Sequence, residues 1–555
     1  MSSRARVGAT TAADGSTARG RLWRHEWKIV VLAGLLLAAL LTWPALRDPA
    51  HTIPGDLGDP TLQAWQMAWA GHAILTDPTA LWHTNTFYPE LYTYAYSDTL
   101  LGYAPIGMIG SGFEAALVRY NITYVLLHAI AFIGAYALVR QLGSHPLGAT
   151  IAGIAWAFAP WRLGHAGHMN ILSSGGIALC LALLARGHGW SLRYGHRPQR
   201  HRPILVLGGW LVAAWQVTLG FGIGLPLVYV LLATSLVVTA RFGWSWWRKG
   251  VRPAFGRRLL IADLVGGAIF ALTTVGIGMV YLRVVDLHPQ AERTLNWTEQ
   301  FSPPWIGLVT APAESWMWGD RHAETRDQLS WPAEMALLPG FTLITLAVLG
   351  VLLSVFKLRH RMLLLAGVVS TALLCLGSTL GGDGDPGYLT MSKHLPGWDA
   401  LRTPGRIMHW TSLLLAILAA GAVSRLVQKA RHLREWSTAA LHVVLILLVE
   451  MTYLEGINRT EHLEVPTPPA ALAAASEPLL VLPMGGLNDL RYMLWSTNDF
   501  PRIANGLAGF EPSSQSHTRA FANSFPDAGS VAYLRGIGIR TVVLLPHLAA
   551  GTQWE

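Results

Sequence analysis

Charged residues are scarce in this chain: Asp, Glu, Lys and Arg make up 13% of its 555 residues, about half the ~25% usual in soluble domains. Cysteine is scarcer still, since Cys180 and Cys375 are the only two and both lie inside apolar stretches. A disulfide framework and a cysteine metal site are therefore disfavoured. Hydrophobic residues make up 52% instead, in long runs that recur from Ile29 to Leu454. This combination predicts an all-α polytopic membrane protein.

Eleven apolar runs are interpreted as transmembrane helices within a membrane domain of residues 29–455. They cover residues 29–46, 121–139, 147–160, 171–185, 204–219, 222–240, 259–282, 338–356, 362–380, 408–424 and 438–455. Residues 1–28, rich in Ser, Thr, Ala and Gly with scattered arginines, are expected to form a disordered basic tail. The first run lacks a small-residue cleavage site, so we expect a retained helix rather than a signal peptide.

Basic residues gather in alternate loops, such as 186–202 with five arginines and 241–258 with six lysines or arginines. Positive-inside sorting makes this side cytoplasmic, which places the N-terminus inside and the C-terminus outside. The same sorting requires residues 99–118 to form interfacial helices at the outer surface rather than another crossing. The net charge of +9 is mostly this cytoplasmic surplus. It suits anionic membrane lipids and does not indicate a nucleic-acid partner.

Four segments on the outer side are too long to be simple connections. They are the loops 47–120, 283–337 and 381–407 and the 456–555 tail. Within the tail, 479–482 and 541–545 have the pattern of strands, with helical patterns between them. The tail is therefore expected to be a small extracytoplasmic α/β domain. Ionisable residues are rare inside the apolar runs, so the chemistry is expected at the outer membrane interface.

Three acids of the first outer loop are candidate catalytic residues. Asp56, in the glycine-bounded stretch Gly55-Asp56-Leu57-Gly58, is interpreted as a general base or a metal ligand. Asp59 precedes Pro60 at the start of a helical pattern, where an N-cap is the alternative to a site role. Asp98 also precedes a helical stretch and fits a cap and a site acid equally well.

The stretch after the third run, from Trp161 to His168, holds candidate substrate-binding residues. His165 and His168 are three residues apart and would share a helix face. They suit either a metal pair or hydrogen bonds to the phosphate or hydroxyls of a substrate. Arg162 offers a bidentate fork that fits a phosphate, with a lipid-headgroup anchor as the alternative.

Arg402 and Arg406 enter the tenth run from the outer side, where the positive-inside rule does not favour arginines. Each of them needs an anionic partner, either an acid such as Asp399 or a lipid phosphate. Arg293 and Glu299, in the 283–337 loop, are weaker candidates.

In their order along the chain, these segments resemble the GT-C type of polytopic glycosyltransferase, which uses a polyprenyl-phosphate sugar as donor. The resemblance covers residues 29 to 545. The motifs that carry it are Gly55-Asp56-Leu57-Gly58-Asp59, Phe87-Tyr88-Pro89, Ser97-Asp98, Phe158-Ala159-Pro160-Trp161-Arg162 with His165 and His168, Glu334-Met335-Ala336-Leu337-Leu338-Pro339-Gly340, His394-Leu395-Pro396-Gly397-Trp398-Asp399-Ala400-Leu401-Arg402 with Pro404 and Arg406, and Leu534-Arg535-Gly536-Ile537-Gly538-Ile539-Arg540.

The resemblance implies a first-loop acid, matched here by Asp56, that acts as a general base or metal ligand. It also implies inverting sugar transfer on the extracytoplasmic face of the cell membrane. The expected activity is hexosyl or pentosyl transfer from a polyprenyl-phosphate donor to a glycan, lipid or protein acceptor, with Mg²⁺ or Mn²⁺ as the candidate cofactor. The alternatives are a non-enzymatic transporter or flippase of lipid-linked glycans and a membrane assembly factor.

Overall fold

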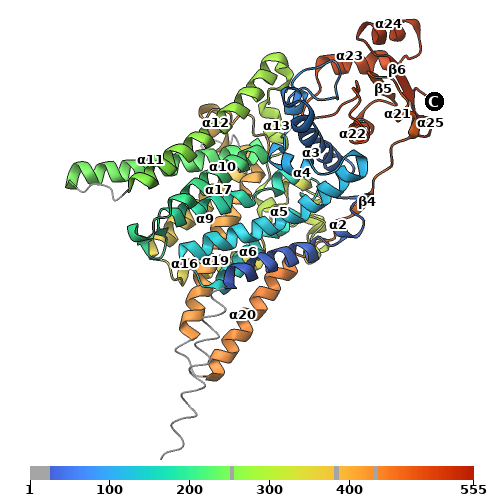
Figure 1. Ribbon diagram of the computed structural model, residues 1–555. Helices are drawn as coiled ribbons and strands as arrows, with labels where there is room; N and C mark the ends of the chain where they lie inside the picture. Colours follow the sequence, from blue (N-terminus) through green and yellow to red (C-terminus); the bar gives the residue numbers. More distant parts are fainter. Residues whose placement is uncertain (1–24, 251–254, 381–386, 431–434) are drawn as a thin grey trace, which may run out of the picture.

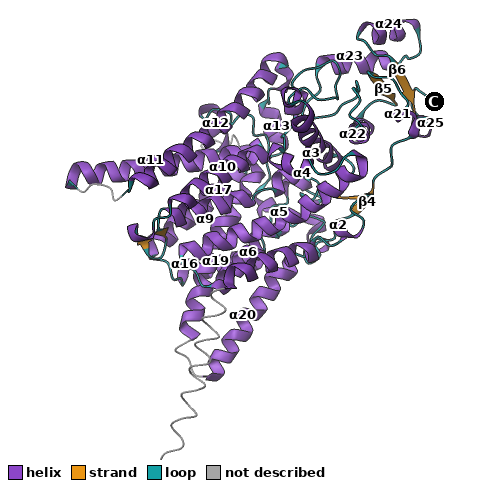
Figure 2. Cartoon of the chain, in the orientation of Figure 1, coloured by secondary structure: helices purple, strands orange, loops and turns teal. Residues whose placement is uncertain are grey.

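The computed structural model describes residues 25–250, 255–380, 387–430 and 435–555, so most of the expected N-terminal tail lies outside the described residues. Helices dominate the fold (Figure 2), and each of the eleven expected ranges is occupied mainly by a helix. These helices are one over residues 25–41, α5 (Gly112–Leu142), α6 (Pro146–Ala157), α9 (Gly175–Gly187), α10 (Pro203–Leu219), α11 (Phe221–Lys249), α12 (Arg257–Leu287), α16 (Phe341–Leu352), α17 (Leu358–Cys375), α19 (Met408–Ala430) and α20 (Glu435–Glu455).

Six helices in the described part of the chain are long and apolar enough to cross a membrane. They span Gly112–Leu142, Met169–Gly187, Phe221–Lys249, Arg257–Leu287, Leu358–Cys375 and Pro404–Ala430. Helices α10 and α16 are apolar but shorter than a membrane is thick. The chain is therefore a multi-pass membrane protein, and the number of eleven crossings stays a prediction.

The helices form one bundle, in which α5 packs on α6 and α9, α9 on α10, and α10 on α12 (Figure 1). Helix α19 packs against α6, α16 and α17. Glycine allows the closest approaches, because a Cβ at Gly350 of α16 would lie 2.1 Å from the carbonyl oxygen of Leu418 in α19. Small residues at such contacts let helix backbones approach closely where lipid offers no hydrophobic driving force.

Short elements fill the outer segments that precede the tail. They are α2 (Pro44–Arg47), β1 (Thr52–Pro54), α3 (Asp59–Thr76), η1 (Pro78–Ala80), η2 (Thr93–Tyr96), η3 (Leu101–Tyr103), α4 (Ala104–Gly107), α7 (Pro160–Leu163), α8 (Met169–Leu172), η5 (Pro289–Ala291), α13 (Leu295–Gln300), η6 (Trp305–Val309), η7 (Asp320–His322), α14 (Ala323–Arg326), α15 (Pro332–Met335), η8 (Gly377–Thr379), α18 (Tyr388–His394) and η9 (Pro404–Ile407). The expectation for 99–118 is partly wrong, because residues 112–118 form the first turns of α5. The short helices η3 and α4 occupy the rest.

The tail contains β4 (His462–Glu464), α21 (Ala470–Ala473), β5 (Leu479–Leu482), α22 (Gly486–Trp495), α23 (Ser513–Ala522), α24 (Ala528–Gly536), β6 (Thr541–Leu544) and α25 (Pro546–Ala549). Strands β5 and β6 lie where the sequence predicts them and pair in parallel, with Leu479 opposite Thr541. The tail is tied to the first outer loop, since β1 and β4 pair antiparallel and Phe87 N donates to Asn505 O over 3.1 Å. Whether residues 456–555 form a separate domain stays a prediction.

The four long outer segments meet at one end of the bundle. Besides the β1–β4 pair, Ser315 and Asn458 form a β-bridge, and Gly509 N donates to Tyr96 O over 3.0 Å. Two of the basic segments meet at the end of α5. Glu26, next to the N-terminal tail, pairs with Arg140 of α5. The 186–202 loop forms a hairpin of β2 (Trp190–Ser191) and β3 (Gly195–His196), followed by η4 (Pro198–Arg200), and the hydroxyl of Ser191 donates to Leu142 O of α5. The long acidic segments and the basic loops, which the charge pattern assigns to opposite sides of the membrane, therefore also gather at different places in the fold.

Candidate active site

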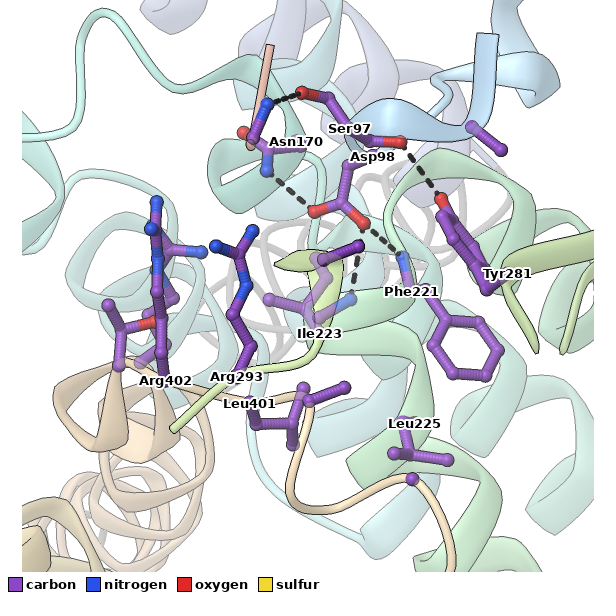
Figure 3. A pocket seen from close by; sticks show the side chains of 18 of the residues that line it. Ser97, Asp98, Asn170, Phe221, Ile223, Leu225, Tyr281, Arg293, Leu401 and Arg402 are labelled. Carbon is purple, nitrogen blue, oxygen red and sulfur yellow. Dashed lines mark hydrogen bonds between the residues drawn. The ribbon is translucent and has the colours of Figure 1, made fainter. Parts of the chain in front are cut away.

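A cavity of about 970 Å³ opens where the outer segments meet. One wall is apolar and comes from the first turns of α11, the last turns of α12 and the 396–401 loop. The polar part of the lining includes Asp59, His168, Arg402 and Arg406, together with Asp98 and Arg293. Figure 3 shows Asp98, Arg293 and Arg402 around this space, together with the apolar side chains of Ile223, Leu225 and Leu401. An apolar trough beside a cationic and acidic wall suits an amphiphilic, anionic ligand.

The structure separates the two acids of the first loop in a way the sequence does not. Helix α3 has Gly58 as its N-cap and begins at Asp59, so the N-cap alternative for Asp59 is wrong. Its carboxylate lines the cavity and is 51% accessible, because it faces that open space. Asp56 is exposed, and its Oδ1 accepts from Gly58 N over 2.6 Å, which closes a local turn. Asp56 is not among the described residues that line the cavity.

His168 is the direct partner of Asp59, with 3.3 Å between its Nε2 and the Asp59 Oδ2. Burial alone raises the pKa of Asp59, but the hydrogen bond and charge of His168, then Arg406 and Arg402, outweigh it and lower the pKa. Burial likewise lowers the pKa of His168, and Asp59 and Glu334 more than reverse that effect, so its pKa is raised. The two residues therefore favour an ionised pair near neutral pH.

Behind this pair the polar network continues through His165 and Glu334. The Nδ1 atoms of His165 and His168 are 3.2 Å apart. His165 is 1% exposed, and burial lowers its pKa to about 3, so it stays neutral. Glu334, from α15, is buried too; burial raises its pKa, but Arg406 and the two histidines lower it to about 2. Both nitrogens of the Arg406 fork donate to this carboxylate.

His165, His168 and Glu334 place three potential ligand atoms within 4.8 Å of one another. Two imidazoles and one carboxylate would suit Mn²⁺ or Zn²⁺ better than Mg²⁺. In this arrangement, however, Arg406 already forms a salt bridge with Glu334, and Asp59 forms one with His168. The group therefore fits an internal hydrogen-bond network, and a cation would have to displace Arg406. Asp56, the expected metal ligand, is not in this group among the described residues.

Arg402 has a different environment from Arg406. Its guanidinium lies over the rings of Trp297 at 5.0 Å and Phe301 at 5.3 Å. Arg293 lies over Trp297 as well, at 5.8 Å. Burial, reinforced by Arg293 and Arg406, lowers the pKa of Arg402 to about 10, which leaves it charged. Within the described ranges no carboxylate forms a salt bridge with Arg402 or Arg293, so both charges are available to an anion.

Arg162 does not reach the cavity, as judged from the described lining residues. It is 1% exposed and donates to Ala157 O, Ser174 Oγ and Leu172 O over 3.0, 2.7 and 2.8 Å. Burial lowers its pKa to about 9. All three nitrogens are thus used to hold the turns between α6 and α9 together. The expectation of a phosphate contact at Arg162 finds no support in this geometry.

Asp98 caps the N-terminus of α11, a helix that is distant from it in sequence. Its Oδ1 accepts from Phe221 N over 2.8 Å at the start of α11, and its Oδ2 accepts from Asn170 Nδ2 over 2.8 Å (Figure 3). Asn170 in turn accepts from Gln63, one turn after Asp59 on α3. Asp98 therefore fixes the apolar wall of the cavity relative to α3, and it remains a candidate site residue because it lines the cavity.

Several cavity residues are missing from the sequence-based set. Gln63, Asn170 and His409 are polar residues in or beside apolar segments, and the tail adds Leu507–Phe510. The only local signal was the i, i+4, i+7 spacing of Asp59, Gln63 and Gln66, which places them on one face of α3. The tail loop carries no such signal, because its position depends on docking to the first loop.

No known protein family matches this chain, and no curated protein matches it in sequence. Solved structures do match. The oligosaccharyltransferase of Archaeoglobus fulgidus in its apo form matches with a TM-score of 0.46 and 13% identity, over 93% of this chain and 69% of that one. The same enzyme tethered to an acceptor peptide with the NVT sequon matches over 94% of this chain, again with a TM-score of 0.46 and 13% identity and over 69% of its own length.

The arabinofuranosyltransferase AftD from Mycobacteria matches with a TM-score of 0.44 and 15% identity, over 94% of this chain and 35% of AftD. Both matched proteins are glycosyltransferases by name, and the resemblance inferred from the sequence named the same class. Because the TM-scores lie below 0.5, no residue role is transferred from them to this chain.

Proposed function

We propose that this protein is a membrane glycosyltransferase that moves a sugar from a polyprenyl-phosphate donor to an extracytoplasmic glycan, lipid or protein acceptor. The observation that carries the proposal is one cavity that is lined by the carboxylate of Asp59, by Arg402 and Arg406, whose charges act on it, and by apolar side chains of α11 and α12. A lipid-phosphate sugar has an apolar chain, an anion and a hydroxylated ring in that order, and the cavity offers a matching surface to each part.

In the proposed reaction, an acceptor hydroxyl attacks the anomeric carbon of the donor. The bond from that carbon to the phosphate oxygen breaks as the bond to the acceptor oxygen forms, with inversion. Asp59 accepts the hydroxyl proton, and polyprenyl phosphate leaves with the electron pair. Asp59 takes the role that the sequence suggested for Asp56, because of these two acids Asp59 is the one among the described residues that line the cavity. His168 holds the Asp59 carboxylate in place.

Arg402 is the proposed phosphate-binding residue, with Arg293 beside it. Their charges have no carboxylate partner among the described residues, so they can stabilise the negative charge that develops on the leaving phosphate. Arg406 acts indirectly, since its fork already binds Glu334. The sequence predicts Mg²⁺ or Mn²⁺ as a candidate cofactor, whereas the pairing of Glu334 with Arg406 and of His168 with Asp59 favours transfer without a cation at these residues.

The test is transfer of radiolabelled sugar from a polyprenyl-phosphate donor by the purified full chain in detergent. A transferase forms a covalent product and releases polyprenyl phosphate without a membrane, whereas a flippase or an assembly factor forms neither. Wild type and Asp59→Asn are compared with Asp56→Asn, the matched control three residues away. Equal product from all three variants would contradict the proposed site, and absence of product from wild type with every donor tested would contradict the function.

A further inference from the structure

Gln63 lies one turn after Asp59 on α3 and is buried, with 4% of its surface exposed. Residues four apart on a helix share a face, so Gln63 and Asp59 are directed toward the same neighbours. Those neighbours are consecutive in sequence. Asp59 pairs with the ring of His168. Gln63 bonds to the next two residues, Met169 and Asn170. One face of α3 therefore holds this short segment through two side chains.

The hydrogen bonds of Gln63 fix the orientation of its amide. The backbone N–H of Met169 can only donate, and it donates to Gln63 Oε1 over 2.8 Å. The amide nitrogen of Gln63 must then point the other way, where it donates to Asn170 Oδ1 over 3.2 Å. We call these two hydrogen bonds the Gln63 clamp. Both ends of the amide are thus used to hold the segment that follows His168.

The clamp satisfies a helix terminus that His168 would otherwise have to cap. Met169 is the first residue of α8, and a helix leaves its first N–H groups without partners inside the helix. Gln63, rather than the N-cap residue His168, supplies the acceptor for Met169. On the other side, His168 N donates to His165 O over 2.8 Å. The backbone is therefore held on both sides of His168, and its ring is available to Asp59.

The second bond of the clamp continues toward α11. Asn170 Nδ2 donates to Asp98 Oδ2 over 2.8 Å, and Asp98 Oδ1 accepts from Phe221 N at the start of α11 (Figure 3). A carboxylate only accepts, so the direction of the bond from Asn170 agrees with the orientation of Gln63. Donors and acceptors are therefore consistent from Met169 N to Asp98. A fully satisfied network of this kind favours one arrangement of α3, α8 and α11.

We infer that Gln63 is a positioning residue for the proposed general base: its clamp holds His168 where the ring bonds Asp59, and so fixes the Asp59 carboxylate in the cavity. This inference rests on the proposed function, in which Asp59 accepts the proton of the acceptor hydroxyl. Gln63 acts through His168 and Asp59 rather than on the donor. A base that is displaced from the attacking hydroxyl loses much of its effect, so Gln63 contributes to turnover rather than to donor binding.

The test compares wild type with Gln63→Met in the full chain, purified in detergent. Methionine has nearly the length of glutamine and makes neither bond of the clamp. The donor is whichever radiolabelled lipid wild type uses best among polyprenyl-phosphate mannose, glucose and arabinofuranose. We expect kcat to fall about tenfold while KM for the donor stays within about twofold of wild type. Gln66→Met is the matched control, because Gln66 is buried on the same face of α3 but donates to Asp98 O over 2.8 Å.

A double-mutant cycle with Asp59→Asn separates positioning from a general role in folding. If Gln63 acts through Asp59, then Gln63→Met should lower kcat about tenfold in wild type but less than about twofold in Asp59→Asn. Gln66→Met should change kcat by the same factor in both backgrounds. A residue that only stabilises the fold behaves like Gln66 in this cycle.

Thermal unfolding of the same variants makes the test independent of turnover. Without the clamp the Asp59–His168 pair is less well formed, so Asp59→Asn should lower the melting temperature less in Gln63→Met than in wild type. In Gln66→Met the effect of Asp59→Asn should equal its effect in wild type.

Three results would overturn the inference. If Gln63→Met lowers kcat equally in wild type and in Asp59→Asn, Gln63 only stabilises the fold. If Asp59→Asn lowers the melting temperature equally with and without the clamp, the clamp does not hold the pair. If Gln63→Met raises KM and leaves kcat unchanged, Gln63 contacts the donor. Absence of transfer by wild type with every donor would instead contradict the proposed function, and the melting temperatures would still show whether the clamp holds the pair.

Discussion

Asp59 and His168 form an ion pair in the wall of the cavity, with 3.3 Å between Oδ2 and Nε2, although they lie 109 positions apart in the sequence. Asp59 starts helix α3 and His168 directly precedes α8. The pair joins the first outer loop to the turns between α6 and α9. It fixes the carboxylate where a lipid-linked sugar and its acceptor would meet.

Replacing Asp59 should affect activity far more than replacing Asp56. Asp59→Asn keeps the size of the side chain and removes its basicity, so transfer should fall by a factor on the order of 10² to 10⁴. Asp56→Asn should stay within a few-fold of wild type, because Asp56 forms only a local turn with Gly58. The measurement is the initial rate of sugar transfer at equal protein. The reverse ranking would restore Asp56 as the base.

Substitutions of Arg402 and of Arg406 should have different effects, one on donor binding and the other on stability. Arg402→Gln should keep the melting temperature and weaken donor binding, since Arg402 has aromatic neighbours but no carboxylate partner in the described ranges. Arg406→Ala should destabilise the fold by about 3–5 kcal/mol, because it leaves Glu334 buried and unpaired. Thermal unfolding and donor binding separate the two outcomes.

The double variant Arg406→Met with Glu334→Gln is the control for Arg406, because it removes both charges together. It should recover much of the stability lost in Arg406→Ala. If Arg402→Gln unfolds as readily as Arg406→Ala, then Arg402 is structural and the assignment of the phosphate contact is wrong.

The Asp59–His168 pair should make stability depend on pH. The lowered pKa of Asp59 contributes stability above its usual value of 3.8 and loses it as pH falls through the folded-state pKa. The raised pKa of His168 contributes below its usual value of 6.5 and loses it as pH rises through its folded-state pKa. The melting-temperature difference between wild type and Asp59→Asn should therefore be largest between these two values and shrink above them.

Asp56→Asn is the matched control for this titration, because it removes a carboxylate of the same loop that bonds to Gly58 N and not to His168. A difference for Asp59→Asn that does not change with pH would mean that the pair is not ionised in solution.

Removal of divalent cations should leave transfer largely intact. The candidate metal ligands are His165, His168 and Glu334. Two of them already have protein partners, because Arg406 pairs with Glu334 and Asp59 pairs with His168. We expect less than a twofold change in rate after EDTA treatment and dialysis. A large loss that Mn²⁺ restores would show that a cation displaces Arg406 from Glu334.

The charge sorting of the loops predicts that the tail lies outside the cytoplasm. A reporter that fluoresces only in the cytoplasm should stay dark when fused after Glu555, while the same reporter in the 241–258 loop should be bright. A bright C-terminal fusion would imply an even number of crossings and move the cavity to the cytoplasmic face.

The sequence by itself determined the positions of the helices, because apolar runs of membrane length are a local property of the chain. It also predicted strands at 479–482 and 541–545, where the structure has β5 (Leu479–Leu482) and β6 (Thr541–Leu544), and it separated the basic loops from the long acidic segments. The stretches that line the candidate active site were also singled out from the sequence, since they contain Asp59, His168 and Arg402.

Only the tertiary structure decided which residues of those stretches face the cavity. Asp56 and Asp59 differ through the point at which α3 begins, and Arg402 and Arg406 differ through Glu334, which lies 72 positions from Arg406. Arg162 donates to two carbonyls and a serine hydroxyl of the neighbouring turns. Hydrogen bonds and burial depend on neighbours that are distant in sequence, and the local pattern of residue types carries no information about them.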